Sequence, residues 1–128
     1  MGEMVTTGAE RPHKRLEVWQ KAMALAEAIY GLTKEFPRSE VYGLSGQMRR
    51  SAISVPCNIA EGAARKTKSE FVQFLTIAQG SLSELDTQVE LACRLGYINE
   101  QRRAEATGEI TTVFKMLSGL VRKVRGAG

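Results

Sequence analysis

The sequence is poor in the residues on which metal centres and redox sites depend. Its 128 residues include one histidine, His13, and two cysteines, Cys57 and Cys93. The cysteines form no CxxC pair, so the chain offers too few ligands, at any recognised spacing, for a zinc or redox motif. We therefore predict that the protein holds no metal and no cofactor, and we expect both thiols to be buried.

Long hydrophobic runs are also missing. No apolar segment approaches the roughly 20 residues that cross a bilayer, and residues 1–11 lack the apolar core of a signal peptide. We therefore expect a cytoplasmic protein without a membrane partner. A hydrophobic content of 43% and a charged content of 25% are ordinary for one compact domain of this length.

Apolar residues recur at helical spacing in four segments, and no segment alternates as a strand does. The first segment, from Leu16 to Phe36, has two stripes: Leu16, Trp19, Met23, Ala26, Tyr30 and Thr33, and beside them Ala22, Leu25, Ile29, Leu32 and Phe36. The apolar arc is wider than one packing seam requires. Its excess either contacts another subunit or forms the flank of a wide core face.

The third and fourth segments have the clearest seams, in which spacings of four and three alternate. The seam residues are Phe71, Leu75, Ala78, Leu82, Leu85, Val89 and Ala92, then Ala106, Ile110, Val113, Leu117, Leu120 and Val124. Thr67 and Glu70 form a capping-box pattern at the start of the third segment. Gly96 supplies its stop, and Asn99 suits the N-cap of the fourth.

Four amphipathic helices with short connections are typical of one architecture. We predict an all-α protein, an antiparallel up-down-up-down four-helix bundle. Residues 13–125 would form the bundle, residues 1–12 a disordered leader, and residues 126–128 a frayed C-terminus.

The second segment, from Leu44 to about Glu61, contains a proline within its apolar run. Pro56 removes a backbone hydrogen bond and crowds the carbonyl four residues back, which predicts a kink. Asn58 and Glu61 follow on one face, and Gly62 is placed to end the helix in a left-handed conformation. Asn58 and Glu61 either satisfy freed backbone groups and a nearby basic residue, or line a polar pocket for a ligand or partner chain.

Arg49 and Arg50 precede this proline on the same segment. Adjacent residues are about 100° apart on a helix, so the two side chains cannot point the same way. We expect one to face solvent and the other to form an ion pair within an assembly, because the planar guanidinium suits such pairs.

Combinations typical of enzymes are absent. His13, at the edge of the predicted leader, is expected to be out of reach of Ser51 and Ser54, and residues 43–46 lack the lysine and spacing of a P-loop. Carboxylates on exposed helix faces are usually solvated, which is our expectation for Glu61, Glu70, Glu84, Asp86 and Glu90. We therefore predict that the protein is not an enzyme.

Positive charge is modest in total, with a formal charge of +4 and an isoelectric point of about 9.3, but it is unevenly placed. Alternating helices bring the start of the first helix, the second connection and the end of the fourth helix together. Cations at a helix start are disfavoured by the helix dipole, so Lys14 and Arg15 favour a phosphate-binding surface over solvation alone. We predict contacts to RNA or DNA phosphates from Lys14, Arg15, Arg65, Lys66, Lys68, Arg122, Lys123 and Arg125. Aromatic residues are sparse nearby, which argues against base stacking and strong sequence readout.

The stretch from Gln47 to Ala52, continued by Ser54 to Gly62, resembles the signature of the four-helix-bundle proteins named after intervening sequences in bacterial 23S ribosomal RNA genes. The resemblance continues through residues 71–75 and 78–85 and covers most of residues 16–124. It implies assembly as a ring, most often a homopentamer. The family is also similar to the accessory variability determinants of diversity-generating retroelements, which associate with a reverse transcriptase and its template RNA.

Three functions follow as alternatives. The first is a non-enzymatic, basic oligomer that binds RNA or DNA phosphates with little sequence readout. The second is an accessory protein that binds a reverse transcriptase and its template RNA, and the third is a structural scaffold without a nucleic-acid ligand.

Overall fold

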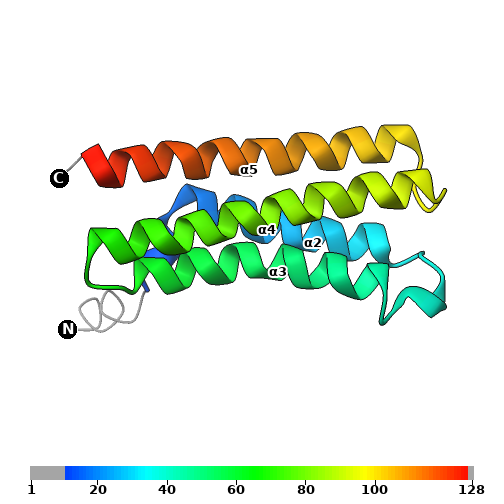
Figure 1. The fold of residues 1–128 in the computed structure, drawn as a ribbon, viewed down its shortest axis with the longest axis horizontal. Helices are drawn as coiled ribbons and strands as arrows, with labels where there is room; N and C mark the ends of the chain where they lie inside the picture. The colour runs from blue at the N-terminus through cyan, green and yellow to red at the C-terminus, as the bar shows by residue number, and fades with distance from the viewer. Residues whose placement is uncertain (1–10, 127–128) are drawn as a thin grey trace, which may run out of the picture.

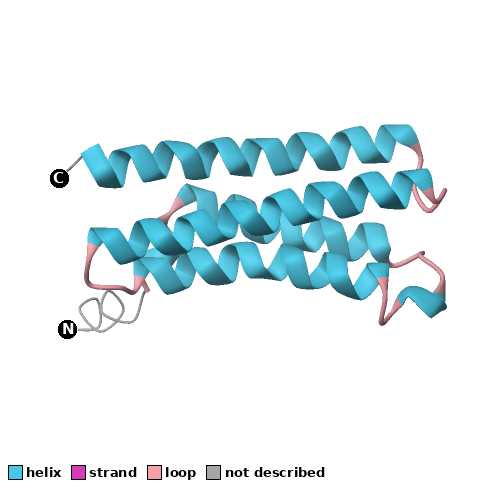
Figure 2. Cartoon of the chain, in the orientation of Figure 1, coloured by secondary structure: helices cyan, strands magenta, loops and turns pink. Residues whose placement is uncertain are grey.

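The computed structural model describes residues 11–126, which are entirely helical or loop. Four long helices follow one another: α2 (Glu17–Thr33), α3 (Leu44–Ala63), α4 (Lys68–Arg94) and α5 (Glu100–Gly126). Two short 3-10 helices, η1 (Pro12–Arg15) and η2 (Arg38–Glu40), precede α2 and α3. The predicted four-helix, all-α class is confirmed for this part of the chain (Figure 2). Most of the predicted leader and residues 127–128 lie outside the described residues.

The helices lie alongside one another in an elongated molecule (Figure 1). The α3–α4 connection, η1 and the end of α5 lie at one end, on the left of Figure 1. The α2–α3 and α4–α5 connections lie at the other end. Residues far apart in the sequence are therefore neighbours at each end of the molecule.

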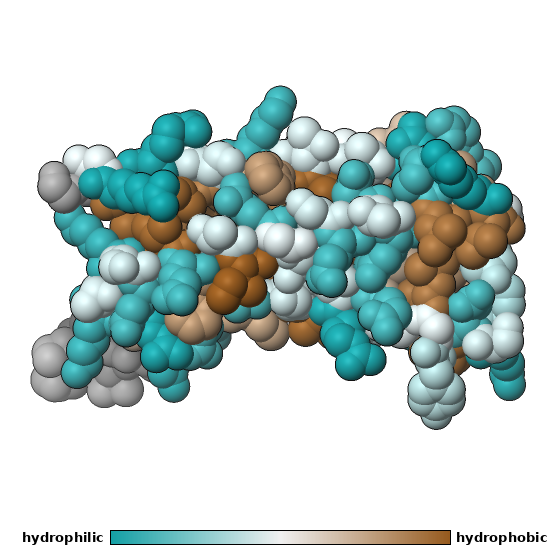
Figure 3. Space-filling view, viewed as in Figure 1, coloured by the Kyte–Doolittle hydropathy of each residue, from teal (hydrophilic) through white to brown (hydrophobic). Residues whose placement is uncertain are grey.

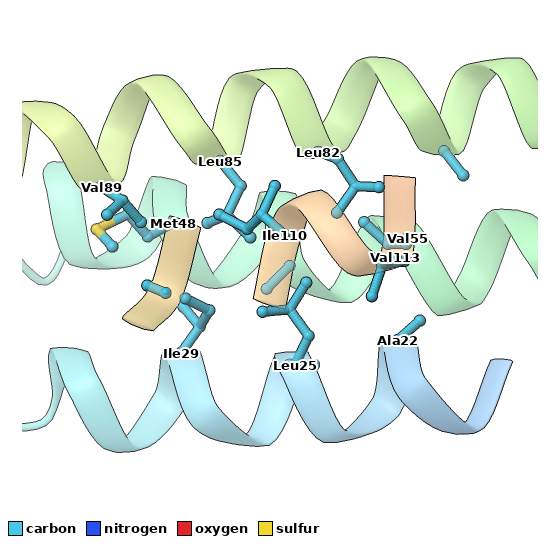
Figure 4. Packing of buried hydrophobic residues seen from close by; sticks show 14 of the residues in the cluster. Ala22, Leu25, Ile29, Met48, Val55, Leu82, Leu85, Val89, Ile110 and Val113 are labelled. Carbon is cyan, nitrogen blue, oxygen red and sulfur yellow. The ribbon is translucent and has the colours of Figure 1, made fainter. Parts of the chain in front are cut away.

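A single apolar core runs the length of the helices (Figure 4). In α4, the predicted seam from Leu75 to Ala92 is fully buried at each of its six positions, and only Phe71 is half-buried. Full burial of one such leucine or valine stabilises the fold by roughly 1.5–3 kcal/mol. In the last turns of α5, Val121 is buried whereas Leu120 and Val124 are only partly covered, so the seam there drifts by one position.

The predicted start and end of α4 and the predicted start of α5 are confirmed by their caps. The hydroxyl oxygen of Thr67 accepts a hydrogen bond from the Glu70 amide at 3.1 Å, and the Asn99 side chain accepts one from the Arg102 amide at 2.8 Å. Gly96, directly after α4, has a φ of +82°, the left-handed conformation that lets a glycine end a helix.

Gly62 has a different role from the predicted one. It lies inside α3, which continues to Ala63, and within residues 11–126 only Gly96 has a positive φ. A Cβ atom at position 62 would come within 2.8 Å of the Phe74 Cβ and 3.0 Å of Phe71. Glycine is therefore required here because α3 and α4 approach closely, and not because the helix ends.

The connection between α2 and α3 is held by a carboxylate. Glu40 accepts hydrogen bonds from the Leu44 amide at 2.8 Å and from the Tyr97 hydroxyl at 2.7 Å, and the Tyr97 ring packs against Phe36. Glu40 thus satisfies a free amide at the start of α3 and ties that start to the loop after α4. The Leu44 amide, and after it the Tyr97 hydroxyl, lower the pKa of Glu40 below its usual value of 4.5.

We predict that the hydrogen bonds of Glu40 make the stability of the fold depend on pH in the acidic range. Because the pKa of Glu40 is lowered in the folded state, its contribution is present above pH 4.5 and is lost as the pH falls through the folded-state pKa. Urea unfolding at pH 7 and pH 3 should show a smaller loss of stability for Glu40→Gln than for the wild type. Glu35→Gln, an exposed neighbour, is the control and should behave as the wild type does. An equal loss in the wild type and Glu40→Gln would contradict the assigned role.

Candidate nucleic-acid interface

Three segments bring cations together at one end of the molecule, on the left of Figure 1. They are η1, the α3–α4 connection with the first turn of α4, and the last turns of α5. All eight residues predicted to contact phosphates lie on these segments and are exposed: Lys14, Arg15, Arg65, Lys66, Lys68, Arg122, Lys123 and Arg125. We call this set the basic end.

Arg65 of the basic end already contacts an acidic and an aromatic side chain of its own chain. Arg65 forms an ion pair with Glu61, one turn before it, and its guanidinium lies 4.8 Å from the centre of the Phe74 ring. The interpretation of Glu61 as the partner of a nearby basic residue is therefore confirmed. Six other cations of the basic end make no ion pair with any described residue: Lys14, Lys66, Lys68, Arg122, Lys123 and Arg125.

A hollow of about 800 Å³ opens between the start of α4 and the end of α5, beside the basic end. Lys68 and Arg125 stand at its rim, and its other lining residues are Ser69, Val72, Gln73, Thr76 and Ile77. Two of these, Ser69 and Gln73, carry hydroxyl or amide donors that can bind an anion, whereas the Thr76 hydroxyl already donates to the Val72 carbonyl at 2.9 Å. The sequence analysis did not select them, although Ser69, Gln73 and Thr76 recur at the helical spacing of four and three.

His13, just before α2, makes contacts that the sequence did not predict. His13 belongs to η1, its backbone carbonyl accepts a hydrogen bond from the Leu16 amide at 3.0 Å, and its ring packs edge-on against Trp19 with centroids 4.9 Å apart. These contacts hold η1, and with it Lys14, against α2. The physical reason is an aromatic contact between residues six apart, which helical periodicity does not predict.

Two cations at the opposite end are paired within their own helices, whereas Lys34, Arg38 and Arg102 there make no ion pair with any described residue. Arg103 contacts Glu100 at 2.9 Å and Arg94 contacts Glu90 at 3.1 Å. The guanidinium of Arg103 lowers the pKa of Glu100, and the Cys93 thiol also donates to that carboxylate. Desolvation, followed by this hydrogen bond, raises the pKa of Cys93, so its thiol stays protonated at neutral pH.

Asn58 belongs to a small polar network between α3 and α4. Its amide nitrogen donates to the Ser54 carbonyl at 2.8 Å and lies 2.9 Å from the Ser54 hydroxyl, which is 2.8 Å from the hydroxyl of Ser81. Asn58 therefore contacts backbone, but not the carbonyl that the sequence analysis expected. The carbonyl deprived of its partner by Pro56 is that of Ala52, whereas Asn58 contacts Ser54. α3 continues through Pro56, and the kink stays a prediction.

The two adjacent arginines of α3 diverge as expected. Arg50 is exposed, whereas Arg49 is half-buried, donates from Nε to the Thr33 hydroxyl at 2.8 Å, and places its guanidinium 4.8 Å from the centre of the Tyr30 ring. No carboxylate of the described residues pairs with Arg49. The expected ion pair therefore does not form within the part of the chain that the structure describes.

An apolar groove of about 600 Å³ runs between α2 and α3. We call it the α2–α3 groove; it is lined by His13, Trp19, Met23, Ala26, Glu27, Tyr30, Ile53, Pro56, Cys57 and Ala60. The first predicted stripe of the first segment supplies one wall, including Met23 at 37% and Tyr30 at 42% exposure, while the second stripe is buried in the core. Cys57 is exposed in the groove, and Cys93 is half-buried, so the expectation of two buried thiols is wrong. Helical periodicity places Cys57 on α3 but does not show how far α2 covers it.

Two general properties complete the description. No helix within residues 11–126 has the length and apolar character needed to span a membrane. In the same residues, no group of three or more histidine, cysteine or acidic side chains is arranged to bind a metal ion.

These features define a basic, all-helical protein built from four long helices. The chain belongs to the 23S rRNA-intervening sequence protein family, whose family model matches residues 14–119. It is similar to a solved structure from Bacteroides thetaiotaomicron, described as a protein with unknown function from the S23 ribosomal protein family. The two are 25% identical, with a TM-score of 0.76 and coverage of 82% of this chain and 98% of the other. No curated protein matches the chain significantly.

We predict that replacing Asn58 weakens the polar network and lowers the free energy of unfolding. Asn58→Leu leaves the Ser54 hydroxyl with one partner fewer in a half-buried position, which should lower stability by about 1–3 kcal/mol. Urea unfolding followed by circular dichroism measures this loss. Gln47→Leu, on an exposed position of the same helix, is the control. An unchanged unfolding midpoint for Asn58→Leu would show that the network contributes nothing to stability.

Proposed function

We propose that the protein is a non-enzymatic oligomer that binds the phosphate backbone of RNA or DNA at its basic end, with little sequence readout. One observation carries the proposal. Six exposed cations from three separate segments share this end and have no acidic partner among the described residues. Helix-dipole compensation accounts for cations at the end of α5, but it does not account for Lys68, the first residue of α4, or for Lys14, which lies three residues before the start of α2.

The surroundings of these cations favour backbone contacts. Each phosphate that a lysine or arginine neutralises releases condensed counterions, which drives binding without regard to sequence. Base stacking requires an accessible aromatic face. Phe74, beside the α3–α4 connection, is covered by the guanidinium of Arg65, and the hollow at Lys68 and Arg125 has no aromatic residue among its lining.

Oligomerisation is the second part of the proposal. We propose an up-down-up-down bundle that repeats in a ring, with five subunits as the resemblance to ring-forming bundles implies. The α2–α3 groove supports this, because apolar surface that is left open on a helix pair marks an interaction site. A ring would place every basic end on one rim and multiply the contacts to one nucleic-acid strand.

We predict that the protein has the mass of an oligomer at micromolar concentration, with five subunits as the family resemblance implies. Multi-angle light scattering coupled to size exclusion measures this directly. Met23→Glu would place a charge at an exposed position of the groove and should shift the mass towards that of a monomer. Glu109→Lys, an exposed change on α5, should leave the mass unchanged. A wild-type monomer would rule out the oligomer.

We predict that binding to RNA or DNA falls steeply with salt and depends on the basic end. Lys66→Glu, Lys68→Glu and Arg125→Glu together remove three phosphate contacts and should lower the slope of log affinity against log salt by roughly 2 to 3. Arg65 is left unchanged, because its reversal would also break the pair with Glu61. Fluorescence anisotropy with a labelled 20-nucleotide RNA and a scrambled version measures affinity and sequence dependence.

The matched control reverses three exposed cations at the opposite end, Lys34, Arg38 and Arg102. It changes the net charge equally, so general electrostatic attraction would make the two triple variants equivalent. Equal losses would refute binding at the basic end. No binding by the wild type at 50 mM salt would refute the nucleic-acid function altogether and favour a scaffold.

A further inference from the structure

Beside the α2–α3 groove lies Arg49, which is held in place but has no acidic partner among the described residues. Tyr30 and Ile53 line the groove, and the Arg49 guanidinium lies over the Tyr30 ring, with its Nε occupied by the Thr33 hydroxyl. Its two terminal nitrogens make no ion pair within residues 11–126. A guanidinium that is already oriented loses little freedom when a carboxylate binds. The groove therefore fits a surface that carries an apolar side chain and, some distance along, a carboxylate.

The outer face of α4 has this composition. Ile77, Gly80, Glu84 and Leu91 follow at intervals of three, four and seven, so they lie on one side of the helix. Ile77 is 47% and Leu91 45% exposed, and no atom lies within 4 Å of the place that a Gly80 side chain would take. Glu84 is exposed and forms no ion pair among the described residues. Figure 3 likewise shows hydrophobic areas between polar side chains on one face of the molecule.

Two contacts establish how far along the molecule each residue lies. Ser54 meets Ser81, and Gly62 meets Phe74, so α3 and α4 run in opposite directions. At 1.5 Å per residue, Arg49 lies about 7.5 Å and Glu84 about 4.5 Å from the level of the serine pair, towards the same end.

On the side of the serine pair away from Arg49, Ile77 of α4 lies at the same level as residues that line the α2–α3 groove. Ile77 lies about 6 Å from the level of the serine pair, between Cys57 at about 4.5 Å and Ala60 at about 9 Å. Cys57 and Ala60 both line the α2–α3 groove. Ile77 is therefore level with the groove, and Glu84 is level with Arg49 to within about 3 Å, which is less than the length of an arginine side chain.

The matching levels of these residues along the helices are important for a ring. Rotation about a cyclic axis parallel to the helices does not shift one subunit along that axis relative to the next. Residues at the same level in one chain then face each other between neighbouring chains. The groove and the outer face of α4 are different surfaces, so a contact between them is heterologous and generates a ring when the rotation closes.

We infer that the α2–α3 groove receives the outer face of α4 from a second copy of this chain, with Ile77 of that copy in the groove and its Glu84 paired with Arg49. Gly80, which adds no side chain, lets the two backbones approach near Pro56. The contact rests on the oligomer proposed above and specifies which surfaces build it. A single type of contact, repeated around the ring, buries both surfaces of every subunit.

Charge exchange tests the pairing. Arg49→Glu and Glu84→Arg, each alone, place like charges opposite each other and should weaken self-association at least tenfold. The double variant restores opposite charges and should recover most of the wild-type association. Sedimentation velocity over 0.5–50 µM would measure the dissociation of each variant, and circular dichroism would establish that each is folded.

The controls use the nearest alternatives on the same helices. Arg50→Glu, at the exposed neighbour of Arg49, should leave association unchanged, and Asp86→Arg should fail to rescue Arg49→Glu. Rescue by Asp86→Arg, or no loss in either single variant while the wild type remains an oligomer, would overturn this contact but leave the oligomer standing. A monomeric wild type would overturn both.

Cys57 provides a second measurement, because its thiol lies in the groove. In a Cys93→Ser background, Cys57 should react with a maleimide at least tenfold more slowly in the oligomer than in the Arg49→Glu variant. Equal rates in an oligomeric wild type and in the dissociated variant would show that the groove is open in the assembly, which would refute the inference even if the charge variants dissociate.

Discussion

The close approach of α3 to α4 is the constraint on which the rest of the structure depends. At Gly62 the two helices leave no room for a Cβ atom, and at Ser54 and Ser81 a hydroxyl pair joins them. Both contacts need small side chains. A large residue at either position would separate the helices and open the core beside Ile59 and Leu82. The levels of all other residues on these helices follow from this contact. It therefore aligns Arg49 with Glu84 and brings Arg65 over Phe74.

The two surfaces to which we assign functions have different physical origins. The basic end exists because connections and helix ends from distant parts of the sequence meet there, while at the opposite end two cations, Arg94 and Arg103, are paired within their own helices. The α2–α3 groove exists because α2 has more apolar surface than the core can bury. One surface is suited to solvated, salt-dependent contact with phosphates, and the other to water exclusion between protein surfaces. The two functions can therefore be separated by mutation.

Sequence patterns predicted the features that depend on neighbours three or four residues away. The buried seam of α4, the caps at Thr67 and Asn99, and the left-handed Gly96 all follow from such local rules. The errors arose where a residue acts through a distant element. Gly62 was assigned to a helix end, yet it is required by Phe74, and Cys57 was assigned to the core, yet α2 leaves it uncovered.

The sequence by itself determined that the chain is helical, where α4 begins and ends, where α5 begins, and which stripe of each helix is apolar, because hydrogen bonding and periodicity act within one helix. Only the tertiary structure decided which surplus apolar residues remain open and which charges find partners. Arg49 illustrates the division. Its position beside Arg50 implied that the two side chains diverge, but only the packing of α2 against α3 sets its guanidinium on Tyr30 and leaves it without an acidic partner within residues 11–126. Contact between helices depends on distances in space, which the spacing of residues along one helix does not encode.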